Sequence, residues 1–440
     1  MKYALIGQDI APLLPSLLTD LLQAGHLRCD VFMEEKNGAM QSLLEGYGNA
    51  CFKHAELGGS FHATASRQEV LHQADVVIYA GDVMAASRFD QDRQSLMSPE
   101  EGQTGLENQA RVLGGIGGLM HTLRQGSFIR PLCEDIRRIC PSALVICMAE
   151  PVARCTEMFR LYGFQVMGLG KSPIRGPGGV DGMARKMGMK LEDVEATWVG
   201  LPSFQFLTDM VVRSTEESVM DTVRHMTADG IFGEMPRRWL RELGGVSVGS
   251  STDHAQFMAA QDGYEPDEHP ELSESVEHRK NRILQMSTVS EKGLFDPDGM
   301  IAQLTLLTRT GPLRPGALSI ALMKKTDLNM PGVCRRNDGR IPGLPDAAMV
   351  EMPLVLFQKK DETPTFTLPP ELLDLMTAVD EANRLAARSA FGDTGAMREY
   401  VETDPALEGL DRLYMLDVVY AMIRSHADIL DAFDLEEDEE

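Results

Sequence analysis

The stretch Asp75-Val76-Val77-Ile78-Tyr79-Ala80-Gly81 decides the fold class. It is an apolar run rich in β-branched residues and closed by glycine, which is typical of a strand buried on both faces of a parallel sheet. The run Tyr3-Ala4-Leu5-Ile6, followed by Gly7, and the run Ala143-Leu144-Val145-Ile146-Cys147-Met148 have the same character. Three such strands in the first third of the chain predict a parallel sheet.

Helical patterns lie between these strands. Residues 15–22 have apolar side chains at helical spacing, and the apolar residues of 129–140 share one helix face. Residues 114–118, rich in glycine, are predicted to form a loop or the start of a helix. Strand, helix and strand at this spacing favour crossover connections in an α/β, Rossmann-like domain that binds dinucleotides. We predict this domain at residues 1–195.

The pattern changes in the second half of the chain, where helices dominate. We predict an α+β domain at residues 196–432, followed by a solvated acidic tail at residues 433–440. The expected elements are helices at residues 216–243, 276–293, 370–391 and 410–432, a strand at 349–357, and a polar surface excursion at 249–275.

The net charge of −24 constrains the partners of the protein. A phosphate backbone must be met by Lys and Arg, so this charge disfavours nucleic acid and anionic membranes. No run of 18 apolar residues occurs, and the first residues lack the small-residue cleavage site of a signal peptide. We therefore expect a cytoplasmic protein. Its seven cysteines, an odd number without a Cys-x-x-Cys pair, are expected to be reduced thiols that fill the core.

Five segments then occur in a fixed order. They are Glu150-Pro151-Val152-Ala153-Arg154-Cys155-Thr156-Glu157, Gly168-Leu169-Gly170-Lys171-Ser172-Pro173-Ile174, Trp198-Val199-Gly200-Leu201-Pro202-Ser203-Phe204, residues 333–345 with Val350-Glu351-Met352-Pro353, and residues 368–405. In this order they resemble the Asn-Pro segment, the metal loop, the Gly-x-Asn-His strand, the Asn-x-Gly-x-Ile-x-x-Leu-Pro and Val-Glu-x-Pro block and the terminal helices of glycoside hydrolase family 4. The resemblance covers nearly the whole chain.

The resemblance implies a second domain of the lactate/malate dehydrogenase and family 4 glycosidase type. It also implies an NAD- and metal-dependent cleavage of sugars. A nicotinamide takes hydride from C3 of the sugar, a base removes the C2 proton, and the glycosidic oxygen leaves by elimination. A divalent metal stabilises the developing enolate. The implied ligand is a sugar or a sugar-derived small molecule, and the implied assembly is a homo-oligomer.

The positions that match the family's metal ligands lack ligand side chains. Gly170 stands where the family has Cys, and Ser203 stands where it has His. Lys171 follows Gly170, and its ammonium group would repel a divalent cation, so we expect no metal here. Lys171 can instead supply a fixed positive charge that stabilises an enolate or binds an anion. The alternative is a surface lysine without a chemical role.

The base and the cofactor loop also depart from the family. The segment that would hold the catalytic tyrosine, residues 236–241, has no tyrosine, and Trp239 is its aromatic residue. Its three arginines are interpreted as an exposed basic helix turn, with phosphate or carboxylate binding as the alternative. The family's Gly-x-Gly-Ser loop reads Gly7-Gln8-Asp9-Ile10, in which Asp9 places a negative charge toward a diphosphate. Glu150, in place of Asn, adds a second negative charge at the same edge. We therefore expect ordinary NAD binding to be disfavoured, while Arg88 matches a family arginine near the cleft.

Three hypotheses remain open. The first, which we favour, is a non-catalytic relative that senses a sugar or nucleotide or partners an active family 4 enzyme. The second is a glycosidase or sugar oxidoreductase of modified mechanism that uses Lys171 and Arg88 as cationic groups. The third is a conventional family 4 glycosidase in which other residues bind the metal.

Overall fold

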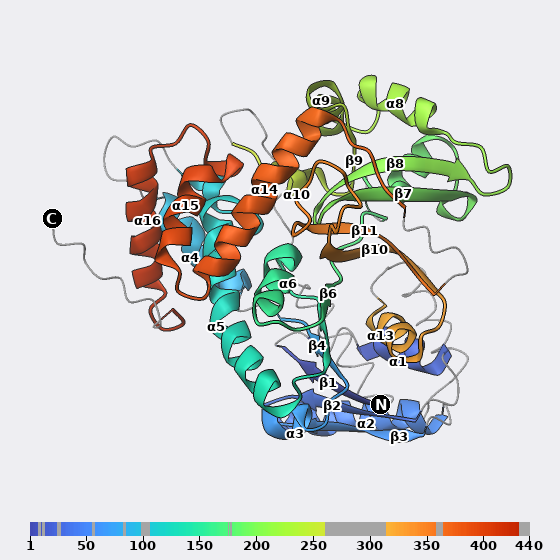
Figure 1. The fold of residues 1–440 in the computed structure, drawn as a ribbon, viewed down its shortest axis with the longest axis vertical. Coiled ribbons are helices and arrows are strands. Elements are labelled where there is room, and N and C mark those ends of the chain that lie inside the picture. Colours follow the sequence, from blue (N-terminus) through green and yellow to red (C-terminus); the bar gives the residue numbers. More distant parts are fainter. Residues whose placement is uncertain are drawn as a thin grey trace.

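The fold is seen in a computed structural model of the chain (Figure 1). It describes residues 1–7, 10, 14–23, 28–54, 58–81, 85–97, 106–174, 176, 178–259, 314–357 and 364–430. The predicted helix at 276–293 and the acidic tail therefore lie outside the described residues. No helix in the described ranges is long and apolar enough to cross a membrane.

One mixed sheet of eleven strands runs through both halves of the chain, in the order β3-β2-β1-β4-β5-β6-β10-β11-β7-β8-β9. The strands are β1 (Lys2–Ile6), β2 (Cys29–Glu34), β3 (Gly59–Thr64), β4 (Val76–Tyr79), β5 (Leu144–Cys147), β6 (Val166–Gly168), β7 (Val194–Leu201), β8 (Phe204–Val212), β9 (Val246–Val248), β10 (Leu328–Arg336) and β11 (Met349–Leu356).

The first six strands are parallel and follow the Rossmann order 3-2-1-4-5-6. The predicted α/β fold with a Rossmann-like parallel sheet is therefore confirmed. The remaining strands pair antiparallel, and they join the parallel part through one pair, Cys334↔Gly168. A single pair, Glu351↔Gly200, then joins β11 to β7.

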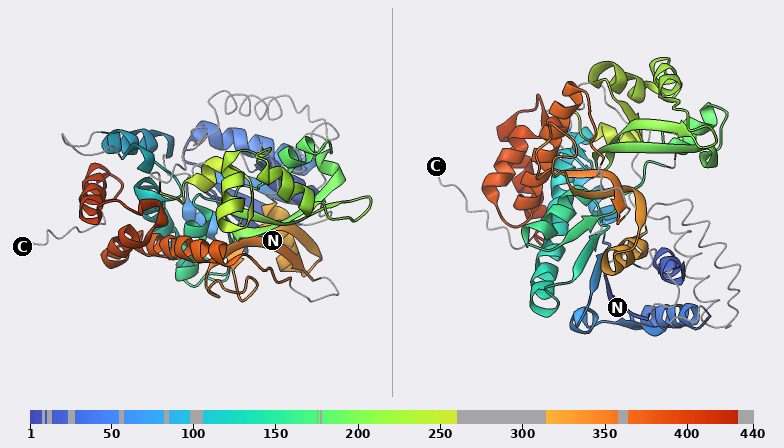
Figure 2. Two further views of the ribbon diagram at one scale, coloured as in Figure 1. Left: turned by 90° about the horizontal axis from the view of Figure 1, so that it is seen from above. Right: turned by 45° about the vertical axis from the view of Figure 1, so that its right-hand side comes forward.

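Helices cover this sheet on both faces (Figures 1 and 2). They are α1 (Leu14–Gln23), α2 (Gly38–His54), α3 (Arg67–Leu71), α4 (Ala85–Met97), α5 (Gly115–Ile139), α6 (Val152–Leu161), α7 (Val180–Lys186), α8 (Met220–Ala228), α9 (Glu234–Leu243), α10 (Ser251–Ala255), α13 (Pro315–Lys324), α14 (Pro370–Ser389), α15 (Thr394–Thr403) and α16 (Arg412–Ser425).

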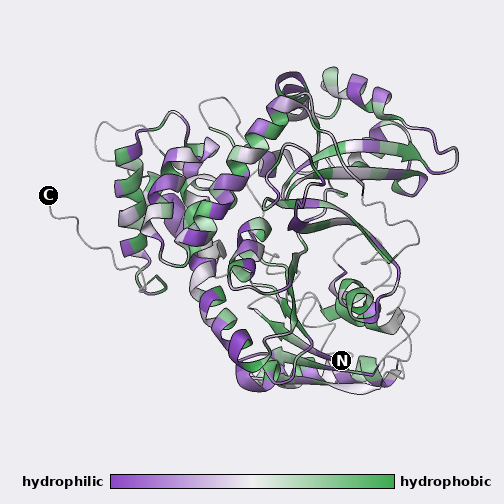
Figure 3. Cartoon of the chain, viewed as in Figure 1, coloured by the Kyte–Doolittle hydropathy of each residue, from purple (hydrophilic) through white to green (hydrophobic). Residues whose placement is uncertain are grey.

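Helices from the second half of the chain complete the core of the first half. Helix α14 packs on α5 and α6, α16 packs on α5, and α13 packs on α1. One core cluster accordingly joins β4 and α5 to α14, α15 and α16. The strands β1 and β4 are coloured as hydrophobic in Figure 3, in keeping with a sheet buried on both faces. All seven cysteines are buried and free, as the sequence predicted.

Two sequence predictions need correction. The helix expected over 216–243 is two helices, α8 and α9, because Gly230 and Gly233 between them adopt φ values of +75° and +117° that end a helix. The excursion expected over 249–275 is not wholly at the surface. Its first part forms α10, and His254 there is buried among aromatic rings.

Candidate functional site

The carboxyl ends of β4 and β5 are held together by α5. Gln125 donates from Nε2 to the carbonyl oxygens of Gly81 at 2.9 Å and of Glu150 at 2.8 Å, and it accepts from the Tyr79 hydroxyl at 2.9 Å. His121 Nε2 lies 3.0 Å from the same Glu150 oxygen. Burial lowers the pKa of His121 to about 3, so the neutral ring donates this bond. Side-chain hydrogen bonds from α5 therefore connect the two strands at the edge where Rossmann-like domains bind ligands.

Gly7 ends β1 at this edge, and its backbone requires glycine. Its φ is +137°, and a Cβ atom there would lie 1.8 Å from the carbonyl oxygen of Ala80. Ile10, predicted as a cofactor-loop residue, is buried. Gln8 and Asp9 lie outside the described residues, so the expected effect of Asp9 on a diphosphate remains a prediction.

Three charged residues from distant segments, Glu150, Lys171 and Asp253, come together at this edge. Burial raises the pKa of the Glu150 carboxyl, Lys171 opposes this rise, and Asp253 of α10 adds to it. Burial also raises the pKa of Asp253, and Lys171 again opposes the rise. Lys171 is exposed, and Glu150 and Asp253 are half-buried residues. We call Glu150, Lys171 and Asp253 the Lys171 group: one cation that faces two acids at the edge of the sheet.

A fourth charged residue, Glu351 of β11, lies behind this group. Its Oε1 accepts from Trp198 Nε1 at 3.3 Å and from Gln205 Nε2 at 3.1 Å. Glu351 is only 3% exposed, and burial, helped by the nearby Glu150 charge, raises its pKa to about 7. The site thus holds a carboxyl group that changes its protonation state near neutral pH.

Gly170 lies directly against Glu351. A Cβ atom at Gly170 would be 3.4 Å from Glu351 Oε2 and 3.3 Å from Val152 Cγ2. The glycine therefore leaves open the space next to the carboxyl group where a longer residue would place its side chain.

Ser203 occupies the two-residue turn that joins β7 to β8. Leu201 pairs with Phe204, so Pro202 and Ser203 are the central residues of this turn. Ser203 has φ +64°, and proline followed by a residue of positive φ is the combination that a type II turn requires. Ser203 is 7% exposed.

Arg88 contacts a different set of residues. Its NH1 atom donates to Gln91 Oε1 at 2.9 Å and lies 3.2 Å from His426 Nδ1, and its NH2 atom pairs with Asp428. His426 in turn contacts the buried Asp92 at 2.6 Å. The contacts of Arg88 thus join α4 to the segment that follows α16, whereas Lys171 interacts with Glu150 and Asp253.

Helix α9, which matches the segment of the family's tyrosine, has one aromatic residue. Trp239 is fully buried and packs edge-on against Phe204 and Phe206. The three arginines of this helix form ion pairs near the surface, which agrees with the interpretation of an exposed basic helix turn. These pairs are Arg237–Glu234, Arg238–Glu242 and Arg241–Glu242.

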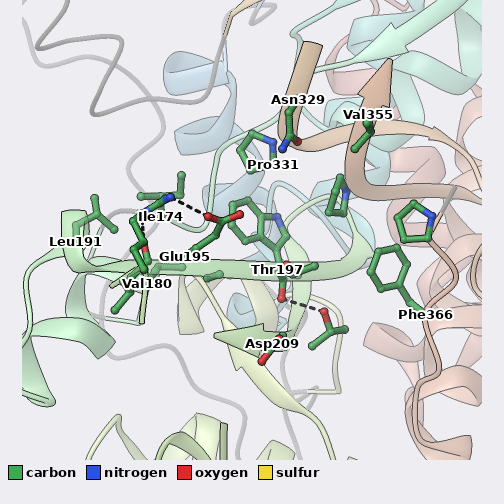
Figure 4. Close-up of a pocket in the computed structure, with 17 residues that line it drawn as sticks. Ile174, Val180, Leu191, Glu195, Thr197, Asp209, Asn329, Pro331, Val355 and Phe366 are labelled. Carbon is green, nitrogen blue, oxygen red and sulfur yellow. Dashed lines mark hydrogen bonds and ion pairs between the residues drawn. The ribbon is translucent and has the colours of Figure 1, made fainter. Parts of the chain in front are cut away.

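A separate cavity of about 810 Å³ opens where β7 and β11 diverge beyond their single pair (Figure 4). Thr197 and Asp209 lie on one side of it, and Asn329 and Pro331 lie on the other. Trp198 also lines this cavity, so its indole ring lies between the cavity and Glu351.

A sequence model described as "Family 4 glycosyl hydrolase" matches residues 21–184. The chain is therefore similar to this family over 164 of its 440 residues. A curated relative, an alpha-glucosidase of Erwinia rhapontici, is 27% identical over 163 residues. That match spans 37% of this chain and about a third (35%) of the relative's length.

Solved structures of 6-phospho-glucosidases share the fold over nearly the whole chain. A 6-phospho-beta glucosidase from Thermotoga maritima, solved with NAD and glucose-6-phosphate, is 17% identical, with a TM-score of 0.69 and coverage of 97% of this chain and 99% of that one. A 6-phospho-alpha-glucosidase from gut microorganisms, solved with NAD and Mn2+, is 16% identical, with a TM-score of 0.68 and coverage of 97% and 98%.

The family's metal does not fit the side chains at the matching positions. Gly170 offers no donor atom, and Ser203 offers only a hydroxyl group. Among the described residues, no three His, Cys, Asp or Glu side chains are grouped so that they could hold a metal ion. The residue after Gly170 is Lys171, whose positive charge acts on the two acids of its group.

Three residues of this site were not identified from sequence. Glu351 entered only as part of a motif that resembles the family, and Asp253 and Gln205 were not singled out. Gln205 and Glu351 are 146 positions apart and meet only because β8, β7 and β11 are neighbours. A polar residue in an otherwise apolar strand, as at Glu351, is the signal that could have found them.

Proposed function

We propose that this family 4-like protein binds a sugar or sugar-derived molecule at the Lys171 group and has lost or altered the NAD- and metal-dependent glycosidase reaction. The observation that carries the proposal is the exchange of a metal site for a fixed cation. Gly170 and Ser203 supply no ligand set, and Lys171 faces Glu150 and Asp253 at the same edge.

The chemistry of the Lys171 group supports an anionic or polyhydroxylated ligand. An ammonium group at the open edge of a sheet binds phosphate or carboxylate as a point charge, without a metal ion. The two carboxyl groups accept hydrogen bonds from sugar hydroxyls. A sensor, or a partner subunit of an active family 4 enzyme, needs only such binding.

NAD remains part of the proposal, with weak binding expected. The parallel sheet, Gly7 and the edge clamped by Gln125 suit a dinucleotide, whereas Asp9 and Glu150 add negative charge where a diphosphate would lie. When bound, NAD would supply hydride transfer. The residues of this chain would supply the edge that orients it.

Calorimetry tests the proposed function. The purified chain is titrated with glucose 6-phosphate, with and without Mn2+, and separately with NAD. We expect glucose 6-phosphate to bind equally well after treatment with EDTA. Glycosidase activity that requires Mn2+ and NAD would contradict the proposal and would support the conventional enzyme.

A pair of lysine variants locates the binding. Lys171→Met should weaken glucose 6-phosphate binding at least tenfold, because it removes the cation at the edge. Lys190→Met is the matched control, since Lys190 is exposed and its side chain pairs with Glu192 on the surface. Equal effects of the two changes would show that only net charge matters.

The alternative function is an enzyme of modified mechanism. The charge of Lys171 favours it, because it acts on both Glu150 and Asp253 and a cation there could stabilise an enolate. Arg88, the second cationic group of this hypothesis, is bonded to Asp428 and Gln91. Incubation with NAD and glucose 6-phosphate, followed at 340 nm, measures NADH formation directly, and NADH that is lost in Lys171→Met would establish the enzyme.

We also propose a cytoplasmic homo-oligomer, on the basis of the family resemblance. Light scattering coupled to gel filtration measures its mass. Co-elution with an active family 4 enzyme would support the partner-subunit form of the proposal, and a monomer that elutes alone would contradict it.

A further inference from the structure

The two oxygens of the Glu351 carboxyl group have different surroundings. The side of Oε1 is closed by protein. It accepts two hydrogen bonds, from Trp198 and Gln205, and a Cβ atom at Gly332 would lie only 2.8 Å away from it. This packing fixes the orientation of the carboxyl plane.

The side of Oε2 is different. This atom is buried but has no hydrogen-bond partner among the described residues. It points to the place of the absent Gly170 Cβ, at 3.4 Å, and the three atoms nearest to that place belong to Glu351 and Val152. Gly170 itself is partly exposed.

Buried polar atoms in folded proteins nearly always have a partner, and one that lacks it deserves an explanation. A second observation indicates from which side a hydrogen-bond partner of Glu351 Oε2 would approach. Gly170 is followed by Lys171, whose charge acts on Glu150 and Asp253 at the open edge, and the Glu150 charge in turn acts on Glu351. The unpaired oxygen therefore adjoins the binding edge.

We propose that Glu351 is a sugar-binding residue, and that its Oε2 atom forms a hydrogen bond with a hydroxyl group of a sugar that lies over Gly170. The inference rests on the proposed function and adds to it the contacting residue and the ligand group. A hydroxyl both donates and accepts, so it pairs with this carboxyl group in either protonation state. A ligand that carries hydroxyls near Glu351 and an acidic group near Lys171 satisfies both residues.

Gly170→Ala tests the inference, because the new methyl group covers Oε2 from the side of the ligand. Its contacts at 3.3 and 3.4 Å require neighbours to move by only a few tenths of an ångström. Glucose 6-phosphate should bind at least tenfold more weakly, with unchanged circular dichroism. Gly38→Ala is the control, because a Cβ at Gly38 meets nothing within 4 Å, and it should bind as the wild type does.

Deoxy sugars provide a test that needs no variant. The 1-, 2-, 3- and 4-deoxy analogues of glucose 6-phosphate are titrated into the wild-type chain, with binding followed by the fluorescence of Trp198, which donates to Glu351. One analogue should bind at least tenfold more weakly, and this loss should be absent in Gly170→Ala. Equal binding of all analogues, or binding to Gly170→Ala within twofold of wild type, overturns the inference and leaves the proposed function intact. A wild-type chain that binds none of these compounds overturns both.

Discussion

The buried carboxyl group of Glu351 should make the stability of the protein depend on pH, and Glu351→Gln should remove that dependence. Glutamine has nearly the same size, and its carbonyl oxygen can keep the hydrogen bonds from Trp198 and Gln205. The substitution therefore changes the ability to ionise and leaves the packing largely unchanged.

The magnitude follows from the pKa of Glu351, which burial raises from 4.5 to about 7. Below pH 4.5 the Glu351 carboxyl group is protonated in both the folded and unfolded states, so its ionisation does not lower the free energy of unfolding. Between pH 4.5 and 7 the Glu351 carboxyl group ionises in the unfolded chain but stays mostly protonated in the folded chain, so the free energy of unfolding falls. Since one pKa unit corresponds to about 1.4 kcal/mol, the total loss by pH 7.5 is about 3 kcal/mol.

Urea unfolding at pH 4.5, 5.5, 6.5 and 7.5 measures this difference. Other acids with raised pKa values, such as Glu150 and Asp253, are common to both proteins, so the comparison isolates Glu351. The stability of Glu351→Gln relative to wild type should rise by about 3 kcal/mol across this range. Glu399→Gln, on the exposed face of α15, is the control, and the pH dependence of its free energy of unfolding should match that of the wild type. If the free energies of unfolding of wild type and Glu351→Gln differed by the same amount at every pH, the reasoning would be refuted.

Three further predictions concern the frame of the site. Gly7→Ala should lower the free energy of unfolding by about 2 kcal/mol or more, because the φ of +137° and a carbonyl oxygen 1.8 Å from the new Cβ both oppose it; an unchanged melting temperature would contradict this. Asp92→Ala should cost about 3–5 kcal/mol in urea unfolding, because it leaves the buried Arg124 and His426 without their shared carboxylate; a cost below about 1 kcal/mol would show that water replaces it. Ser203→Gly should raise stability by about 1 kcal/mol in thermal unfolding, because glycine adopts its φ of +64° without strain, and a fall would show that the hydroxyl is needed.

Local patterns predicted the parallel half of the fold well. The apolar runs at β1, β4 and β5 are strands buried on both faces, and such runs have a recognisable composition. Strand β10 was not predicted. It contains Pro331 and Gly332, and its register with β11 shifts between Met330 and Val333, so its pattern resembles a loop.

The motifs predicted the family better than they predicted the roles of the residues. Asn337, which opens the late family block, does not face the site. It is fully buried, and its side chain holds a loop by accepting from the Ile341 amide at 2.7 Å and donating to the Ile341 and Leu344 carbonyls at 3.0 Å. Sequence alone does not distinguish a residue that shapes a loop from one that meets a ligand, because both occur in short polar motifs.

The meeting of Glu351 with Gly170 could not be predicted from either segment. It depends on the antiparallel placement of β10 between β6 and β11, which joins strands more than 150 positions apart. Lys171 was identified because it departs from a family pattern, and its neighbour Asp253 was not, because it lies on a short helix with no such pattern.

The covering of the first sheet by α14 and α16 has a consequence for synthesis on the ribosome. The apolar faces of α5 and α6 are complete once Leu161 has been added, but the helices that bury them, α14 and α16, begin only at Pro370. The nascent N-terminal half must therefore keep hydrophobic surface exposed for nearly half of translation, a state prone to aggregation. The rate at which the N-terminal half reaches its native packing then depends on contacts between segments far apart in the sequence, which are slow to form.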